Sequence, residues 1–156
     1  MSTSGKSWPG NWSAKAADMP DLLVDTSGWG SLVDANQPYH ALAAAIYRAA
    51  RQDGRRIVTT NYILAELVTL MTTPLRIPRS RTIAFIESLK TSPYVEVVHV
   101  DVELDEQAWQ LLRRRQDKEW SLADSASFVV MRQRNILEAM TTDHHFEQAG
   151  FVRLLK

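Results

Sequence analysis

The sequence predicts an α/β protein, a three-layer α/β/α sandwich around a mostly parallel, five-stranded sheet. Five short apolar or β-branched runs are separated by longer segments with helical patterning, the alternation expected of a parallel sheet with helical crossovers. The first run, residues 22–24, lacks apolar–polar alternation, which is typical of a strand buried on both faces. The chain has 156 residues, 45% of them hydrophobic, which suffices for one domain with a sizeable core.

In the first half of the chain, strand runs and helices are expected to alternate. Residues 38–51 are rich in alanine, and Pro38 suits the first turn of a helix. Asn61 is expected to cap the next helix, which stops before Pro74. The first strand ends in a polar turn at residues 25–28. The expected elements of this half are strands at 22–24 and 57–60, and helices at 38–51, 62–71 and 78–90.

The second half repeats the alternation. Residues 103–116 read as an amphipathic, charged helix, and residues 121–134 as a helix with an apolar body. The run at 136–141 is expected to be a strand, although Glu138 and Ala139 are unusual in one. The expected elements of this half are strands at 95–100, 136–141 and 151–155, and helices at 103–116, 121–134 and 143–148.

Residues 1–20 are expected to form a flexible N-terminal tail, and residues 21–156 the folded domain. Ser, Gly, Pro and Ala dominate the tail, which lacks the apolar stretch of a secretory signal. The longest apolar run, residues 41–47, is far shorter than the ~20 residues that cross a bilayer. We therefore expect a cytoplasmic protein without a membrane partner.

Charge and cysteine content exclude several classes of function. Eighteen Lys and Arg residues balance eighteen Asp and Glu residues, so no overall basic field attracts nucleic acid. Binding to nucleic acid would need local patches or metal ions. The chain has no cysteine, which excludes disulfide scaffolds, thiolate metal sites and cysteine nucleophiles.

Four acidic residues stand nearly alone in apolar surroundings. Three of them are each the sole charged residue in a stretch of twelve or more. A lone acid in such a stretch must be paired, protonated, capping a helix or holding a metal. In a parallel sheet, ligands bind beyond the carboxyl ends of the strands, where we expect all four to meet. The four residues are Asp25, Glu66, Asp124 and Asp143.

Each acid also has a structural explanation. Asp25 could cap the helix after the first strand, and Asp143 could cap its own short helix. Ser121 and Asp124 have the spacing of a capping box. Glu66 lies too deep in its helix to be a cap, and it borders the apolar stripe of that helix, away from open solvent. The shared position of the four acids at one sheet edge therefore indicates a site, whereas no single residue does.

Converging carboxylates favour a bound cation. Like charges raise one another's pKa, so an empty cluster is costly. Oxygen ligands suit Mg²⁺ or Mn²⁺, whereas the lack of Cys and of a His pair at the spacing of zinc proteases argues against zinc. Such a site can activate water and neutralise charge on a phosphate, which makes phosphodiester hydrolysis the natural chemistry.

Four motifs in order carry a resemblance to a known family: LLVDTS at 22–27, NYILAE at 61–66, WSLADSASF at 120–128 and TTDHHF at 141–146. Over residues 21–156, the sequence resembles the PIN-domain ribonucleases, especially VapC-type toxins of toxin–antitoxin pairs. The resemblance implies a parallel sheet between helices, an acidic Mg²⁺ or Mn²⁺ site and cleavage of single-stranded RNA. It also implies an RNA substrate, a cognate antitoxin and a homodimer.

The four acids match the acidic quartet of that family, and we expect them to be both catalytic and metal-binding. Asp25 and Asp124 are the expected direct metal ligands. Asp143 is expected to complete or orient the site, directly or through water. Glu66 is expected to bind a second ion or to accept a proton from the attacking water.

Other polar residues are candidates for supporting roles. Hydrogen bonds that hold the carboxylates are expected from Ser27, Ser121 and Thr142. Contacts with RNA phosphates are expected from Arg76, Arg79 and Arg81, which cluster around a proline. The two neighbouring histidines, His144 and His145, are expected to be exposed on a short helix.

Other functions stay open at the level of the sequence. A receiver-like signalling module would have paired acids early in the chain and a Lys at the end of a late strand, and neither is present. A non-catalytic PIN scaffold that binds RNA or a partner is a further alternative. A PIN nuclease of RNA processing or decay, acting without an antitoxin, is another.

Overall fold

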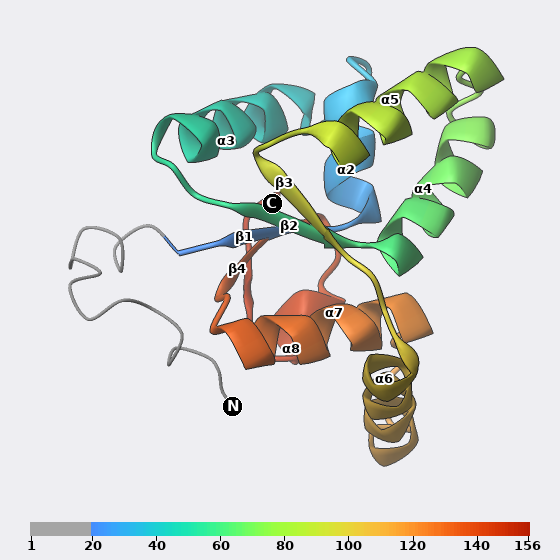
Figure 1. The fold of residues 1–156 in the computed structure, drawn as a ribbon, viewed down its shortest axis with the longest axis vertical. Coiled ribbons are helices and arrows are strands. Elements are labelled where there is room, and N and C mark those ends of the chain that lie inside the picture. The colour runs from blue at the N-terminus through green and yellow to red at the C-terminus, as the bar shows by residue number, and fades with distance from the viewer. Residues whose placement is uncertain (1–19) are drawn as a thin grey trace.

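Five strands form the central sheet of this computed structural model, which describes residues 20–156 (Figure 1). The strand order is β3-β2-β1-β4-β5, and every neighbouring pair is parallel. The expected three-layer α/β/α architecture with five strands is confirmed, and the sheet is parallel throughout. The strands are β1 (Leu22–Val24), β2 (Ile57–Thr60), β3 (Val95–Val98), β4 (Glu138–Met140) and β5 (Val152–Arg153).

Helices cover both faces of the sheet, as Figure 1 shows. One face carries α2 (Thr26–Val33), α3 (His40–Gln52), α4 (Asn61–Thr72) and α5 (Arg79–Thr91). The other face carries α6 (Val102–Arg114), α7 (Leu122–Arg134) and α8 (His145–Gln148). The chain moves outward from β1 to β3 and then returns to β4, so the order reverses between β1 and β4. That reversal is where ligands bind in open α/β sheets.

The central strands are apolar because helices shield them from water on both sides. All three residues of β1 are fully buried, as are Ile57 and Val58 of β2. On one face Trp29 packs edge-on against aromatic rings of α3 and α5. On the other face Phe128 packs edge-on against two further aromatic rings. The sheet is thus held between two aromatic layers of the core.

Several local expectations are corrected. The strands expected at 136–141 and 151–155 are shorter, and the polar turn expected at 25–28 begins α2. Thr60, rather than Asn61, caps α4, because the Thr60 hydroxyl accepts a hydrogen bond from the Ile63 backbone at 3.1 Å. Asn61 instead accepts a bond from the Val100 backbone at 2.7 Å, which ties α4 to the chain after β3. Strand β3 ends at Val98 because its ladder partner there is Thr60, after which α4 begins. The expected strand at 95–100 therefore loses its last two residues.

The first turn of α2 runs very close to the end of β4. A Cβ atom on Gly28 would overlap the carbonyl oxygen of Met140. Only glycine lets the two backbones approach this closely. The close contact brings the residues that follow β1 beside those that follow β4.

None of the described helices is long and apolar enough to cross a membrane. The flexible tail expected at residues 1–20 lies, apart from Pro20, outside the described residues.

Candidate active site

A cavity of about 440 Å³ opens at the carboxyl edge of the sheet, where the strand order reverses. It is lined by residues from the β1–α2 junction, α4, the start of α7 and the loop after β4. The structure brings together all four acids singled out in the sequence. They are Asp25, Glu66, Asp124 and Asp143.

Asp25 is buried, and its carboxylate is held by three hydrogen bonds. Oδ1 accepts from the Ser27 hydroxyl at 2.8 Å and from the Gly28 backbone at 2.9 Å, while Oδ2 accepts from the Thr141 hydroxyl at 2.7 Å. The bond from Gly28 makes Asp25 the N-cap of α2. Burial nevertheless raises the pKa of Asp25 from 3.8 to about 7, because loss of water outweighs these bonds. The charge on Asp124 acts in the same direction.

Asp124 combines a capping role with a position in the cavity. Its backbone donates to the Ser121 hydroxyl at 2.9 Å, and its Oδ2 accepts from the Ser121 backbone at 3.1 Å. This is a complete capping box at the start of α7. Burial raises the pKa of Asp124, and the neighbouring charge of Asp143 adds to the increase. Asp124 therefore caps α7 and lines the cavity at the same time, so a capping role does not exclude a role in the site.

Glu66 lies in the second turn of α4, at the exposed rim of the cavity. It is more exposed than its place beside the apolar stripe of the helix suggested. One oxygen accepts a hydrogen bond from the Thr26 hydroxyl at 3.1 Å. Partial burial of the carboxylate raises the pKa of Glu66, and the charges of Asp124 and Asp143 contribute. Glu66 therefore interacts electrostatically with Asp124 and Asp143 from the solvent-exposed side of the cavity.

Asp143 follows β4 and is linked to Asp124 through a histidine. The Asp143 backbone donates to the Thr141 hydroxyl at 2.9 Å, and Asp143 Oδ1 accepts from the His145 backbone at 2.9 Å. The Nδ1 atom of His145 lies 3.2 Å from Asp124 Oδ2 and 3.3 Å from Asp143 Oδ1. Only 20% of the His145 side chain is exposed, so the expectation of an exposed residue is wrong here, whereas His144 is exposed.

The supporting hydrogen bonds differ in part from those expected. Ser27 contacts a carboxylate through its hydroxyl, and Ser121 contacts one through its backbone. Thr142 reaches the network through its backbone, which donates to the Ser27 hydroxyl at 2.9 Å. Its neighbour Thr141 is the residue whose hydroxyl touches Asp25. Sequence reasoning also missed Thr26, and the sole signal for either threonine is its position beside a predicted acid.

The three arginines considered for RNA binding lie apart from the acidic cavity. They are exposed around the connection from α4 to α5, and none lines the cavity. Within residues 20–156, none of them forms an ion pair. They are Arg76, Arg79 and Arg81.

The donor set of the cavity fits a hard divalent cation. Carboxylate and hydroxyl oxygens dominate its polar lining, and no Lys or Arg is among the described lining residues. Burial is the largest cause of the raised pKa values of Asp25, Glu66 and Asp124, and a neighbouring carboxylate adds to each increase. A divalent cation would favour their ionised forms. Asp143, His144 and His145 also place one ligand atom each within 4.8 Å of one another, so nitrogen donors adjoin the oxygen set.

Comparisons with known proteins identify the family of this chain. The chain matches the family model of the PIN domain over residues 22–152. The 23S rRNA-specific endonuclease VapC20, from two strains of Mycobacterium tuberculosis, is 34% identical over 133 residues, which cover 85% of this chain and 97% of that protein.

Solved structures show the same relationship. The crystal structure of Mycobacterium tuberculosis VapC20, described as a sarcin-ricin loop cleaving toxin, matches with a TM-score of 0.75 and 32% identity. That match covers 87% of this chain and all of the other. FitAcB from Neisseria gonorrhoeae shares the fold, with a TM-score of 0.57 at 17% identity over 86% and 96% of the two chains. This chain therefore belongs to the PIN domain family, and its relatives there include VapC-type endonucleases.

Proposed function

We propose that this protein is a metal-dependent endoribonuclease that cleaves single-stranded RNA and acts as the toxin of a toxin–antitoxin pair. The observation that carries the proposal is the convergence of four carboxylates, from four separate parts of the chain, on one cavity. The activity named for VapC20 supports the same class of reaction, because that relative is matched over 97% of its length. For the same reason, 23S rRNA is the substrate to test first.

A Mg²⁺ or Mn²⁺ ion at this site would supply positive charge to the scissile phosphate and polarise the attacking water. We assign Asp25 and Asp124 as its direct ligands and Asp143 as the residue that completes the set. Asp25 is held by three donors, and Asp124 by Ser121 and His145. Both carboxylates are thus oriented before any ion arrives, which favours tight and specific coordination.

Glu66 suits a different task. Its carboxylate is on the open side of the cavity, with a single hydrogen bond from Thr26. A raised pKa makes a carboxylate a better proton acceptor near neutral pH. We assign Glu66 to the attacking water, either as proton acceptor or as ligand of a second ion.

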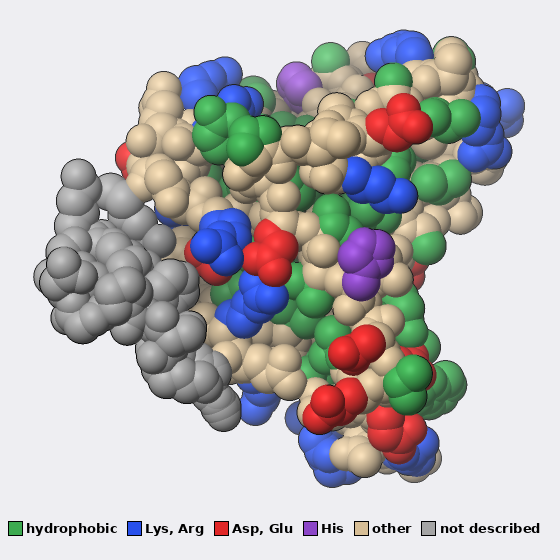
Figure 2. Space-filling view, viewed as in Figure 1, with side chains coloured by type: hydrophobic (Ala, Val, Ile, Leu, Met, Phe, Trp, Pro, Cys, Tyr) green, Lys and Arg blue, Asp and Glu red, His purple; other side chains and the backbone are tan. Residues whose placement is uncertain are grey.

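The RNA strand needs positive charge outside the cavity. Arg76, Arg79 and Arg81 are exposed and form no ion pair within the described residues, so their charges are free to meet phosphates. Figure 2 shows Lys and Arg side chains gathered at the end of the molecule where α4 and α5 meet. We assign these arginines to the backbone of the bound RNA.

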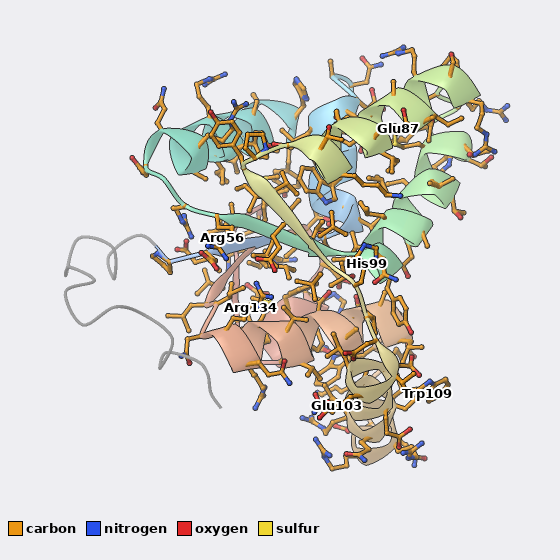
Figure 3. All side chains as sticks on the ribbon, in the orientation of Figure 1. Arg56, Glu87, His99, Glu103, Trp109 and Arg134 are labelled. Carbon is orange, nitrogen blue, oxygen red and sulfur yellow. The ribbon has the colours of Figure 1, made fainter. Side chains whose placement is uncertain are left out.

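We also propose a homodimer, a cognate antitoxin and a cytoplasmic location. Several apolar side chains are exposed, which favours contacts with other chains. On α6 these include Val102 and Trp109, the latter labelled in Figure 3, and on α5 they include Ile83. By contrast, Leu64 and Leu67 of α4 belong to the core.

Light scattering after gel filtration measures whether the protein is a dimer. Co-purification with the product of a neighbouring gene tests for the antitoxin.

Cleavage of purified 23S rRNA tests the function directly. Wild type is expected to cut it with Mn²⁺ or Mg²⁺ and to be inactive in EDTA. Asp124→Asn should lower the rate by at least about a thousandfold, roughly 4 kcal/mol of transition-state stabilisation. Asp101→Asn is the matched control, because Asp101 caps α6 as an acid outside the cavity. Equal cleavage by wild type and Asp124→Asn would overturn the proposal, and failure to bind Mn²⁺ in calorimetry would favour a non-catalytic scaffold.

A further inference from the structure

A second cavity, of about 460 Å³, lies between α6 and α7 and shares no lining residue with the acidic cavity. We call it the α6–α7 groove. Its volume falls in the range of pockets that hold small ligands. Its lining contains three arginines, three glutamines and an apolar floor, and no Asp or Glu. The arginines at the rim are Arg114, Arg115 and Arg132, and the floor includes Leu111, Trp120 and Val129.

Within the described residues, two of the three guanidinium groups have no acidic partner. Arg115 is bound to Asp117 at 3.0 Å and lies 5.2 Å from the centre of the Trp120 ring. Arg114 is exposed and forms no ion pair within the described residues. Arg132 has one long hydrogen bond there, 3.4 Å, to a backbone carbonyl. The groove therefore attracts anions, whereas Arg113 on the same helix is paired with Glu106 at 3.1 Å.

The combination of surfaces suits a nucleotide. Half-buried Leu111 and Val129, beside Trp120, form an apolar floor that can take the face of a base. The guanidinium groups at the rim can bind its phosphate. Gln107 and Gln133, joined by a 2.8 Å hydrogen bond, add amide groups that can meet the edge of a base.

The groove adjoins the acidic cavity through a short piece of chain. Trp120 in its floor immediately precedes Ser121, the cap of α7, and Asp124 lines the acidic cavity. Four residues span at most about 14 Å even when fully extended. In Figure 1, α6 and α7 lie on the same side of the sheet. A strand leaving the cavity can reach the groove within a few nucleotides.

We propose that the α6–α7 groove binds a nucleotide of the RNA substrate away from the bond that is cut. The inference rests on the proposed ribonuclease function and adds a contact outside its catalytic centre. A contact of this kind strengthens binding of RNA long enough to reach it and leaves the chemical step unchanged. The groove should therefore affect KM for long substrates and leave kcat unaltered.

The test compares two double variants that each remove two positive charges. Arg114→Ala with Arg132→Ala changes the groove. Arg113→Ala with Lys90→Ala is the control, because neither residue lines the groove. All four side chains are exposed, so both proteins should keep the wild-type melting temperature. The probe is a fluorescein-labelled, single-stranded RNA of twelve nucleotides in EDTA, so that binding is measured by anisotropy without cleavage.

The groove variant should bind the probe about tenfold more weakly than wild type, whereas the control should bind within about twofold. The slope of log affinity against log salt should become shallower by about 0.7, the contribution of one phosphate contact in single strands. On 23S rRNA with Mn²⁺, the groove variant should raise KM and retain kcat. Cleavage of a dinucleotide, too short to reach the groove from the acidic cavity, should not change.

Equal binding by the groove variant and the control would overturn the inference. So would a fall in kcat with unchanged KM, which would mean that these arginines act on the chemistry. The proposed function can fail separately: wild type would then cut no RNA, while the anisotropy comparison would still decide whether the groove binds it.

Discussion

The two sides of the acidic cavity hold carboxylates in opposite ways. At the β1–α2 junction, Asp25 is buried and held by three donors. Across the cavity, Glu66 is exposed at the rim with a single hydrogen bond from Thr26. The difference in burial appears in the pKa values, since Asp25 reaches about 7 while Glu66 is raised less. Burial fixes the position of the Asp25 oxygens but makes the folded protein less stable when that carboxylate is ionised. On the open side, the Glu66 carboxylate is free to accept and release protons.

The largest expected effect separates metal binding from proton transfer. Asp25→Asn should lower cleavage by at least about a thousandfold and remove Mn²⁺ binding, because it replaces a fixed anionic ligand. Glu66→Gln should lower cleavage about a hundredfold and still bind Mn²⁺, as expected for the loss of a proton acceptor. Cleavage assays with Mn²⁺ calorimetry measure both. Equal loss of Mn²⁺ binding in the two variants would contradict the contrast between the two sides.

The next effect concerns the backbone that places Asp25. Gly28→Ala should destabilise the protein by about 3 kcal/mol, because its Cβ would meet the backbone of Met140 and the Val24 side chain. Gly30→Ala is the matched control in the same helix. Its Cβ would lie 2.8 Å from Cδ2 of Leu70, a side chain that can shift, so the change should stay within about 1 kcal/mol. Urea unfolding measures the loss of stability in each variant. Similar losses of stability would show that the close approach of α2 to β4 does not require glycine at position 28.

The third prediction concerns pH. The folded pKa of Asp25, about 7, lies above its ordinary value of 3.8. The stabilising contribution of the protonated carboxyl is therefore complete below about pH 4 and is lost as pH rises through about 7. In EDTA, Asp25→Asn should gain stability relative to wild type between pH 5 and pH 8, by a few kcal/mol.

Added Mn²⁺ sharpens the same test. Ionised carboxylates bind metal, so Mn²⁺ should raise the melting temperature of wild type more at pH 8 than at pH 5. Glu66→Gln should show a smaller change with pH than Asp25→Asn, since Glu66 is more exposed. A stability difference between Asp25→Asn and wild type that is flat from pH 5 to pH 8 would refute the effect of burial.

The smallest expected effects come from the two threonines that hold these acids. Thr141→Val removes a 2.7 Å bond to buried Asp25 and should cost about 2 kcal/mol of stability and at least about tenfold in Mn²⁺ affinity. Thr26→Val removes a 3.1 Å bond at the exposed rim and should cost less than about 1 kcal/mol. Thermal unfolding and calorimetry rank the two. The reverse order would mean that the rim, not the buried junction, controls the site.

Much of the fold and the choice of acids followed from local patterns. The strand at 22–24 is apolar at every position because both faces are buried, and that signal is visible without a structure. Asp124 could be recognised both as a capping residue and as a lone acid, and it takes both positions. The strand at 95–100 was predicted too long, since its end depends on where its neighbour β2 turns into α4.

The supporting residues of the cavity followed from tertiary contacts instead. Two adjacent threonines follow β4, and the sequence does not distinguish Thr141 from Thr142. The register of β4 against β1 decides it, because Val24 pairs with Met140 and the next residue, Thr141, is then level with Asp25. His145 was wrongly expected to be exposed, because the fold alone brings it beside Asp124, which lies 21 residues away at the start of α7.

By itself, the sequence determined the α/β alternation and the lone acids, because periodicity, capping and charge spacing are local properties. It also led us to expect that these acids meet, since parallel strands bring their carboxyl ends to one edge of the sheet. Tertiary structure alone decided which carboxylate is buried, which hydroxyls hold it, and that α6 and α7 enclose an arginine-lined groove. Burial and hydrogen-bond partners depend on which distant segments pack together. No short stretch of residues encodes that packing.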